Sequence, residues 1–287
     1  MGEITQIAWC HKTKSMWHGC TKVSDGCRFC YAARDAVRFP GRRGIWGPNG
    51  TRVVSANWQE YIAWNRKARS EGVAYRVFPS LCDPFEDFQG YMTDKHGNIF
   101  DATMGYIRRL WFEDVAMKTP SLRHLLLTKR PGNILPFWPV MESAGDIAPF
   151  PGMPGPLGQP LPAVRKAGMN NIWLGTSVEN QEMADKRIPE LVKCRSLSPV
   201  LWLSIEPLLG PIEFKSLKGI DWAIIGGESG PNHRECDPKW FDRIAEQCMD
   251  SGVKVFVKQD SGPNPGFKGR LSDHLWSLKE IPSDSVA

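Results

Sequence analysis

Six short apolar runs recur along the chain, and polar side chains follow each of them. The runs are Arg76–Cys82, Arg123–Lys129, Asn171–Ser177, Val200–Ile205, Trp222–Gly226 and Lys254–Lys258. Near-continuous β-branched, leucine and aromatic residues over such lengths predict strands that are buried on both faces. We expect a further strand, the first in the chain, either at Gln6–Cys10 or just before Cys20. The pattern therefore predicts about seven strands.

Helical periodicity fills the intervals between several of these runs. It covers Trp58–Glu71, Gly105–Lys118, Gln181–Cys194 and Pro238–Ser251. Strands that alternate with helices predict parallel β-α units. The expected fold class is therefore α/β, as a complete or partial (β/α) TIM-type barrel made by one domain over residues 1–287.

Two segments interrupt this alternation. Residues 131–168 hold nine of the 23 prolines and precede the fourth expected strand, so we interpret them as a Pro/Gly-rich spacer on the amino-end face. Residues 83–103 follow the second expected strand and carry several aromatic side chains. They are the better candidate for a lid over the functional face.

Polar residues stand at the carboxyl end of every expected strand after the first, which is where β/α barrels carry their chemistry. Each of them alone is as well explained by a solvated loop or a helix cap. Their repetition at strand after strand favours a functional site. They are Asp83, Glu86, Thr128, Lys129, Arg130, Ser177, Glu179, Asn180, Ser204, Glu206, Glu228, Ser229, Lys258 and Gln259.

Three cysteines lie close together near the amino end, at Cys20, Cys27 and Cys30, with the spacing C-x6-C-x2-C. Such thiolates suit an iron–sulfur cluster, and three of them would leave one iron of a four-iron cluster open. Two other readings stay open: a zinc site completed by His18 or His11, and unligated buried thiols.

Composition adds few constraints to this picture. The net charge of +5 and the pI near 8.7 permit an anionic partner without requiring one. The amino-terminal sequence indicates neither a signal peptide nor a membrane span, so we expect a cytoplasmic protein. In that reducing compartment the other cysteines, Cys10, Cys82, Cys194, Cys236 and Cys248, are expected to stay reduced.

Basic residues follow the cysteines closely. Arginines interleaved with an aromatic side chain can hold phosphates and stack a base, although a solvated basic loop is the plainer reading. The candidates for nucleic-acid contact are Arg38, Arg42, Arg43, Trp46 and Arg52, with Arg34 just before them.

The sequence as a whole resembles the radical S-adenosylmethionine (radical SAM) superfamily, and more narrowly its phage-associated branch. The blocks that carry the resemblance are MWHGCTKVSDGCRFCYA, LLTKRP, NIWLGTSVENQEMADKRIP, SIEPLLGPI, IIGGESGPNHR, FVKQ and GRLSDHLW. They run through nearly the whole chain. The final C-x-aromatic-C, Cys27 to Cys30, matches the superfamily, whereas its usual spacing of C-x3-C-x2-C is replaced by a first gap of six residues.

The resemblance implies a [4Fe-4S] cluster on the three cysteines and S-adenosyl-L-methionine on its open iron, used to make a 5′-deoxyadenosyl radical. Phe29 would then lie against the adenine, Glu179 would reach a ribose hydroxyl, and Lys129 or Arg130 would pair with the methionine carboxylate. Ser177 and Glu206 are further cofactor candidates. Glu228, Lys258 and Gln259 are expected to act on the substrate.

The same resemblance implies a modified nucleotide or DNA base as substrate, with isomerisation of an amino-acid-substituted thymine in phage DNA as the sharpest hypothesis. A base in duplex DNA would have to be flipped out of the stack. A one-electron donor of the flavodoxin or ferredoxin type would be the protein partner. The alternatives are a radical enzyme acting on a free metabolite or protein side chain, and a non-catalytic zinc-binding nucleic-acid module.

Overall fold

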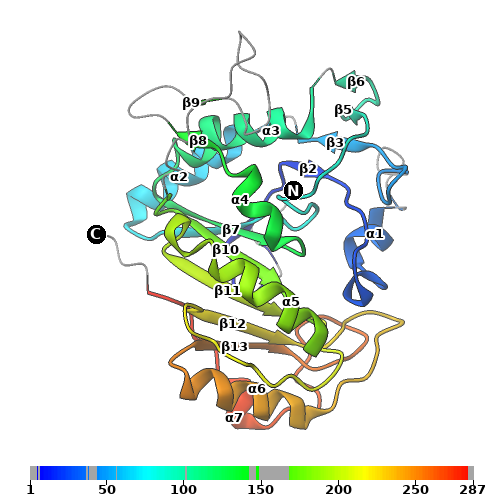
Figure 1. Cartoon of the computed structure of the whole chain (residues 1–287), viewed down its shortest axis with the longest axis vertical. Helices are drawn as coiled ribbons and strands as arrows, with labels where there is room; N and C mark the ends of the chain where they lie inside the picture. The colour runs from blue at the N-terminus through cyan, green and yellow to red at the C-terminus, as the bar shows by residue number, and fades with distance from the viewer. Residues whose placement is uncertain are drawn as a thin grey trace.

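A curled sheet of seven parallel strands forms the centre of the molecule and makes a half-barrel (Figure 1). The protein is described from a computed structural model, which covers residues 5, 7–36, 38, 44–55, 57–100, 102–141, 147–148 and 168–283. The strand order is β1-β4-β7-β10-β11-β12-β13. The strands span Lys12–Thr13 (β1), Tyr75–Phe78 (β4), Leu122–Thr128 (β7), Ile172–Ser177 (β10), Val200–Ile205 (β11), Trp222–Gly226 (β12) and Lys254–Gln259 (β13).

The six apolar runs of the sequence are confirmed as six of these strands. The first strand is Lys12–Thr13, and it pairs with β4. It lies between the two predicted positions: the described residues of Gln6–Cys10 form a turn and coil, in which the Trp9 ring is buried, and the strand just before Cys20, Trp17–His18, belongs to a second sheet. β1 and β13 are the two edges of the sheet, so the barrel is of the open, partial kind.

The four predicted helices are also confirmed, with small shifts at their ends. The second of them, predicted at Gly105–Lys118, consists of α3 followed by a π-helical turn at Phe112–Ala116. The helices span Tyr31–Ala36 (α1), Gln59–Glu71 (α2), Met104–Trp111 (α3), Ile134–Phe137 (α4), Gln181–Val192 (α5), Pro238–Asp250 (α6) and Asp273–Ser277 (α7). Among the described helices, none is long and apolar enough to cross a membrane.

A small second sheet, which the sequence did not predict, lies beside the half-barrel (Figure 1). Its strands are Trp17–His18 (β2), Arg52–Val54 (β3), Met92–Thr93 (β5) and Ile99–Phe100 (β6). Because β5 pairs with β3 and Phe85 is fully buried, the first part of the expected lid is packed into the fold. The exposed parts of the segment, which include Tyr91 and Ile99, are the ones left for a lid. A third sheet pairs Val140–Met141 (β8) with Ile147–Ala148 (β9). Most of the Pro/Gly-rich insertion lies outside the described residues.

The two faces of the large sheet differ in content. One face packs with α2, α3, α5 and α6 in the main apolar core. The other face is filled at its amino end by a separate aromatic cluster, in which Trp9, Trp202 and Trp222 lie with ring centroids 5.5–6.2 Å apart. Side chains alternate along a strand, so Ser204 lies on the same face as Trp202 but nearer the carboxyl end. The aromatic cluster thus leaves only the carboxyl end of this face for polar chemistry.

Candidate functional site

The thiol loop, Cys20–Cys30, carries the three cysteines at the carboxyl end of the half-barrel. Gly19 forms a parallel bridge with Cys82, just beyond β4. Cys27 ends a 3-10 turn, and Cys30 N–H donates to Cys27 O at 3.5 Å immediately before α1. Residues three apart in a helical turn share one side, so the C-x2-C pair can present both thiols in one direction.

Three carboxylates, each following a different strand of the half-barrel, fix this loop. Glu86 Oε1 accepts from Thr21 N–H at 2.8 Å, and Glu179 Oε1 accepts from Gly26 N–H at 3.4 Å. Glu228 binds Arg234 in a forked pair, and that guanidinium donates to Asp25 O at 3.1 Å. The loop is therefore held from the ends of β4, β10 and β12 at once.

Four charged side chains next to the first cysteine make up the four-charge network: the buried Arg52, Glu86 and Asp83, and the half-buried Arg130. Arg52 donates to both oxygens of Glu86 at 2.9 Å, and both side chains are almost fully buried, at 0% and 1% exposure. Arg130 pairs with Asp83 at 2.7 Å and lies 3.6 Å from Glu86. Two cations face two anions, which is the condition under which buried charges are tolerated.

Arg130 also contacts the thiol loop directly. Its Nη1 lies 3.7 Å from Cys20 Sγ, and its Nη2 donates to Thr21 O at 2.8 Å. Burial raises the pKa of the Cys20 thiol well above its usual range; Asp83 and Glu86 push the pKa in the same direction, and Arg130 opposes them. A ligand to a metal must be a thiolate, so Arg130 is the neighbouring group that favours the ligating form.

The donor set of the loop fits an iron–sulfur cluster chemically. All three thiols are free of disulfides and only half-buried, so they remain accessible. Within the described part of the chain, no three His, Cys, Asp or Glu side chains converge closely enough to hold a metal ion. Metal binding would thus require the cysteine side chains to turn towards one another. His11, one expected zinc ligand, has its Nδ1 occupied by Arg76 N–H at 2.8 Å.

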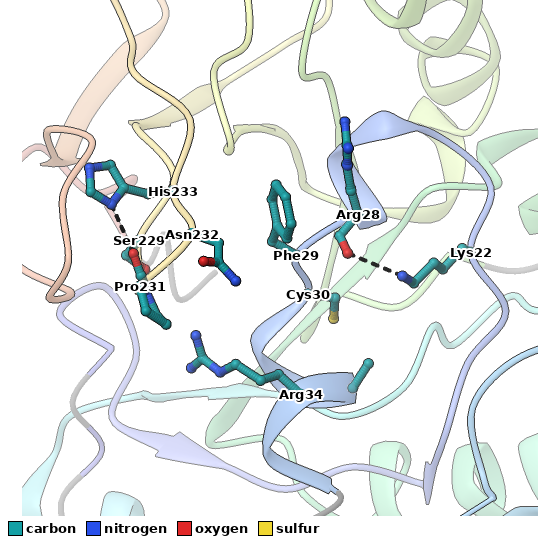
Figure 2. Close-up of a pocket in the computed structure, with 11 residues that line it drawn as sticks. Lys22, Arg28, Phe29, Cys30, Arg34, Ser229, Pro231, Asn232 and His233 are labelled. Carbon is teal, nitrogen blue, oxygen red and sulfur yellow. Dashed lines mark hydrogen bonds between the residues drawn. The ribbon is translucent and has the colours of Figure 1, made fainter.

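A pocket of about 300 Å³ opens beside the thiol loop, between that loop and residues 229–233 (Figure 2). Phe29 stands in it, and Figure 2 shows Arg34 and Asn232 reaching towards each other across the hollow. The guanidinium carbons of Arg28 and Arg234 lie 5.2 and 5.3 Å from the Phe29 ring centroid. Several of the described lining residues are basic and none is acidic, so the pocket favours an anionic ligand with a flat ring.

A second polar group occupies the ends of β11 and β13. Lys258 Nζ donates to Glu206 Oε1 at 2.5 Å, and both side chains keep about a fifth of their surface exposed, at 18% and 20%. They remain available to a ligand. Ser177, at the end of β10, is 1% exposed, and its hydroxyl has no hydrogen-bond partner among the described residues.

Three of the residues expected to contact a ligand have side chains that face protein groups in this structure. Glu179 has no exposed surface; its Oε2 accepts from Arg187 at 2.8 Å and its Oε1 from Gly26 N–H at 3.4 Å, so in this structure it supports the thiol loop. Gln259 is equally buried and donates to Gly227 O at 3.0 Å. Glu228 is 6% exposed and is occupied by Arg234, so it positions that arginine.

The basic segment after the cysteines is only partly what the sequence suggested. Arg38 is exposed, and Trp46 is half-buried. Arg42 and Arg43 lie outside the described residues. Arg52, expected to contact phosphate, has its guanidinium fully buried against Glu86 and the carbonyls of the surrounding loop.

Sequence reasoning missed Arg234, the residue that joins the end of β12 to the thiol loop. The available signal was its place in the block IIGGESGPNHR, six residues after Glu228. Lys129 is half-buried, and its backbone N–H donates to Asp83 at 3.1 Å.

The sequence was also compared with known proteins. Residues 4–268 match the family described as "Protein of unknown function (DUF5131)". No curated protein and no solved structure matches the chain. Since the match covers most of its length, the chain belongs to the DUF5131 family.

Proposed function

We propose that this protein is a radical SAM enzyme whose [4Fe-4S] cluster is bound by Cys20, Cys27 and Cys30. The observation that carries the proposal is the bracing of the thiol loop by carboxylates from three strand ends. A loop of unligated core thiols would need no such support, whereas a reactive group must be held rigidly over the half-barrel. The open seven-stranded sheet is compatible with the partial barrel of that superfamily.

The bound cofactors would supply reductive cleavage of S-adenosylmethionine, giving a radical that removes a hydrogen atom from the substrate. The chain's own part is to bind, to orient and to exclude water. Phe29 offers its ring to the adenine, and Lys129 is the cation left for the methionine carboxylate, since Arg130 is engaged by Asp83 and Thr21. The unpartnered Ser177 hydroxyl is a ready hydrogen-bonding group.

The substrate we propose is a modified nucleotide or DNA base, with isomerisation of an amino-acid-substituted thymine as the specific reaction. The basic lining of the Phe29 pocket supports an anionic substrate of this kind. Lys258 and Glu206, exposed together at the strand ends, are positioned to hold polar groups of the substituent. A small redox protein would deliver the electron.

The test is anaerobic reconstitution followed by iron and sulfide analysis and an assay for 5′-deoxyadenosine. We expect about four irons for each chain of the wild type, as a single four-iron cluster requires. Cys27→Ala should lose both the iron and 5′-deoxyadenosine formation while remaining folded. Cys248→Ala, a buried thiol on α6, is the matched control and should retain both.

A different metal content would contradict the radical SAM proposal and favour one of the alternatives. Zinc without sulfide would favour a zinc-binding module, and a chain without metal would leave three ordinary thiols. If the cluster is present, nucleoside mass spectrometry of treated phage-modified DNA tests the substrate. A change in retention without a change in mass indicates isomerisation, whereas unaltered DNA would favour a metabolite or a protein side chain as substrate.

A further inference from the structure

Arg130 occupies a position in which its guanidinium joins the thiol loop to the four-charge network. Nη1 is shared between Asp83 Oδ2 at 2.7 Å and Cys20 Sγ at 3.7 Å, and Nη2 donates to Thr21 O at 2.8 Å. The side chain is 15% exposed. The contact between Arg130 Nη1 and Cys20 Sγ places a charged donor directly against the sulfur of an expected cluster ligand.

The charges around this contact determine its effect. Asp83 Oδ2 shares the Arg130 Nη1 with Cys20 Sγ, and Glu86 Oε1 accepts from Thr21 N–H, so two carboxylates next to Cys20 disfavour further negative charge there. Arg52 is turned to Glu86 and the carbonyls of its own loop. Arg130 is consequently the cation whose charge reaches Cys20. Hydrogen bonds to the sulfurs and local net charge are among the factors that set the potential of an iron–sulfur cluster.

We propose that Arg130 is a positioning residue that raises the reduction potential of a cluster bound through Cys20, by placing a charged N–H against that sulfur. This inference rests on the proposed function. Reduction adds negative charge to the cluster, and Arg130 stabilises the reduced form whereas Asp83 destabilises it. The sequence expectation that Arg130 binds the methionine carboxylate is replaced by this role.

The experiment is a redox titration of the reconstituted protein, followed by electron paramagnetic resonance, for the wild type and three variants. Arg130→Gln should shift the potential to more negative values by at least the equivalent of a tenfold change in the reduction equilibrium, about 59 mV for one electron. Arg130→Lys keeps the positive charge but loses the two-pronged guanidinium, so the shift in its reduction potential should be smaller than that of Arg130→Gln. Asp83→Asn removes an anion from the same network, so its shift should be positive.

The shifts in reduction potential expected for Arg130→Gln and Asp83→Asn have opposite signs. Damage to the four-charge network would instead shift the potential of both variants in the same direction, so the signs distinguish an electrostatic role from a structural one. Arg109 on α3 forms an ion pair with Glu113 in the π-helical turn that follows, and Arg109→Gln is the control that should leave the potential unchanged. If Arg130→Gln does not fold, the Lys and Asn variants carry the test. Potentials within error of wild type, or shifts of one sign, would overturn the inference. A wild type without iron and sulfide would instead overturn the proposed function.

Discussion

Replacing Gly26 by alanine tests whether Glu179 braces the thiol loop. A Cβ on Gly26 would lie 2.9 Å from Glu179 Cδ and 3.0 Å from Oε1. Non-bonded carbon contacts are optimal at about 3.5–4.0 Å, so the carboxylate would have to retreat by roughly 0.5–1 Å. Glu179 is fully buried and tied to Arg187, so little room is left for that retreat.

The size of the effect follows from the contact that is lost. The hydrogen bond from Gly26 N–H is already 3.4 Å long, and a further retreat breaks it. A hydrogen bond to a charged group contributes about 1.5–3 kcal/mol, and overpacking costs a similar amount. We take about 2 kcal/mol, near the lower end, because the bond is long. Local opening of the thiol loop should then become about 30-fold more frequent, since each 1.4 kcal/mol is a factor of ten.

Native-state hydrogen exchange of peptides covering residues 21–30 measures this opening without any metal. The matched control is Gly132→Ala, where the nearest atom to the added Cβ is Glu190 Oε2 at 3.8 Å, an ordinary contact. Exchange in Gly26→Ala within about threefold of the wild type, a free-energy change under about 0.7 kcal/mol, would refute the assignment of Glu179 as a brace.

Three further changes have defined outcomes. Arg52→Met leaves Glu86 buried without its partner and should lower the free energy of unfolding by about 3–5 kcal/mol in denaturant titrations; a loss under about 1 kcal/mol would contradict the pairing. Burial lowers the pKa of His124 from 6.5 to about 3. Only the unfolded state binds that proton between these values, so stability should fall below pH 6.5, by up to about 1.4 kcal/mol for each pH unit. His124→Gln should flatten this slope between pH 6.5 and 5, and an unchanged slope would exclude His124 as its source. Phe29→Ala should weaken binding of S-adenosylmethionine to the reconstituted protein about tenfold, from a lost stacking contact of about 1–3 kcal/mol; an equal dissociation constant would remove Phe29 from the cofactor site.

The sequence predicted the large sheet because strands buried on both faces leave near-continuous apolar runs. Val200–Ile205 shows this directly, since every residue of the strand is buried. β1 has two residues, Lys12 and Thr13, and leaves no run at all. The strands of the second sheet have only two or three residues, and their pairing depends on contacts between distant segments. Periodicity carries no information about such contacts.

The candidate site was predictable in place but not in detail. A carboxylate at a strand end is expected to lie at the functional face, and Glu179 does. Whether it faces a ligand or the protein depends on Gly26, 153 residues away, and on Arg187 in the next helix. Arg52 reads as a basic loop residue until its pairing with Glu86 is known. The position of these residues in the sequence predicts which end of the sheet they lie at. Their hydrogen-bond and ion-pair partners become known only from the fold.

The long separations in these contacts also order events during synthesis. Arg234 supports Asp25 across 209 residues, so the thiol loop leaves the ribosome long before its last support exists. At about 5–20 residues per second this interval is roughly 10–40 s. During this interval the three thiols belong to a nascent chain that still lacks Arg234, one of the residues that hold the thiol loop in the folded protein. If the proposed cluster forms, its insertion should therefore follow completion of the polypeptide, or require a carrier protein that holds the loop until β12 and the residues after it have been made.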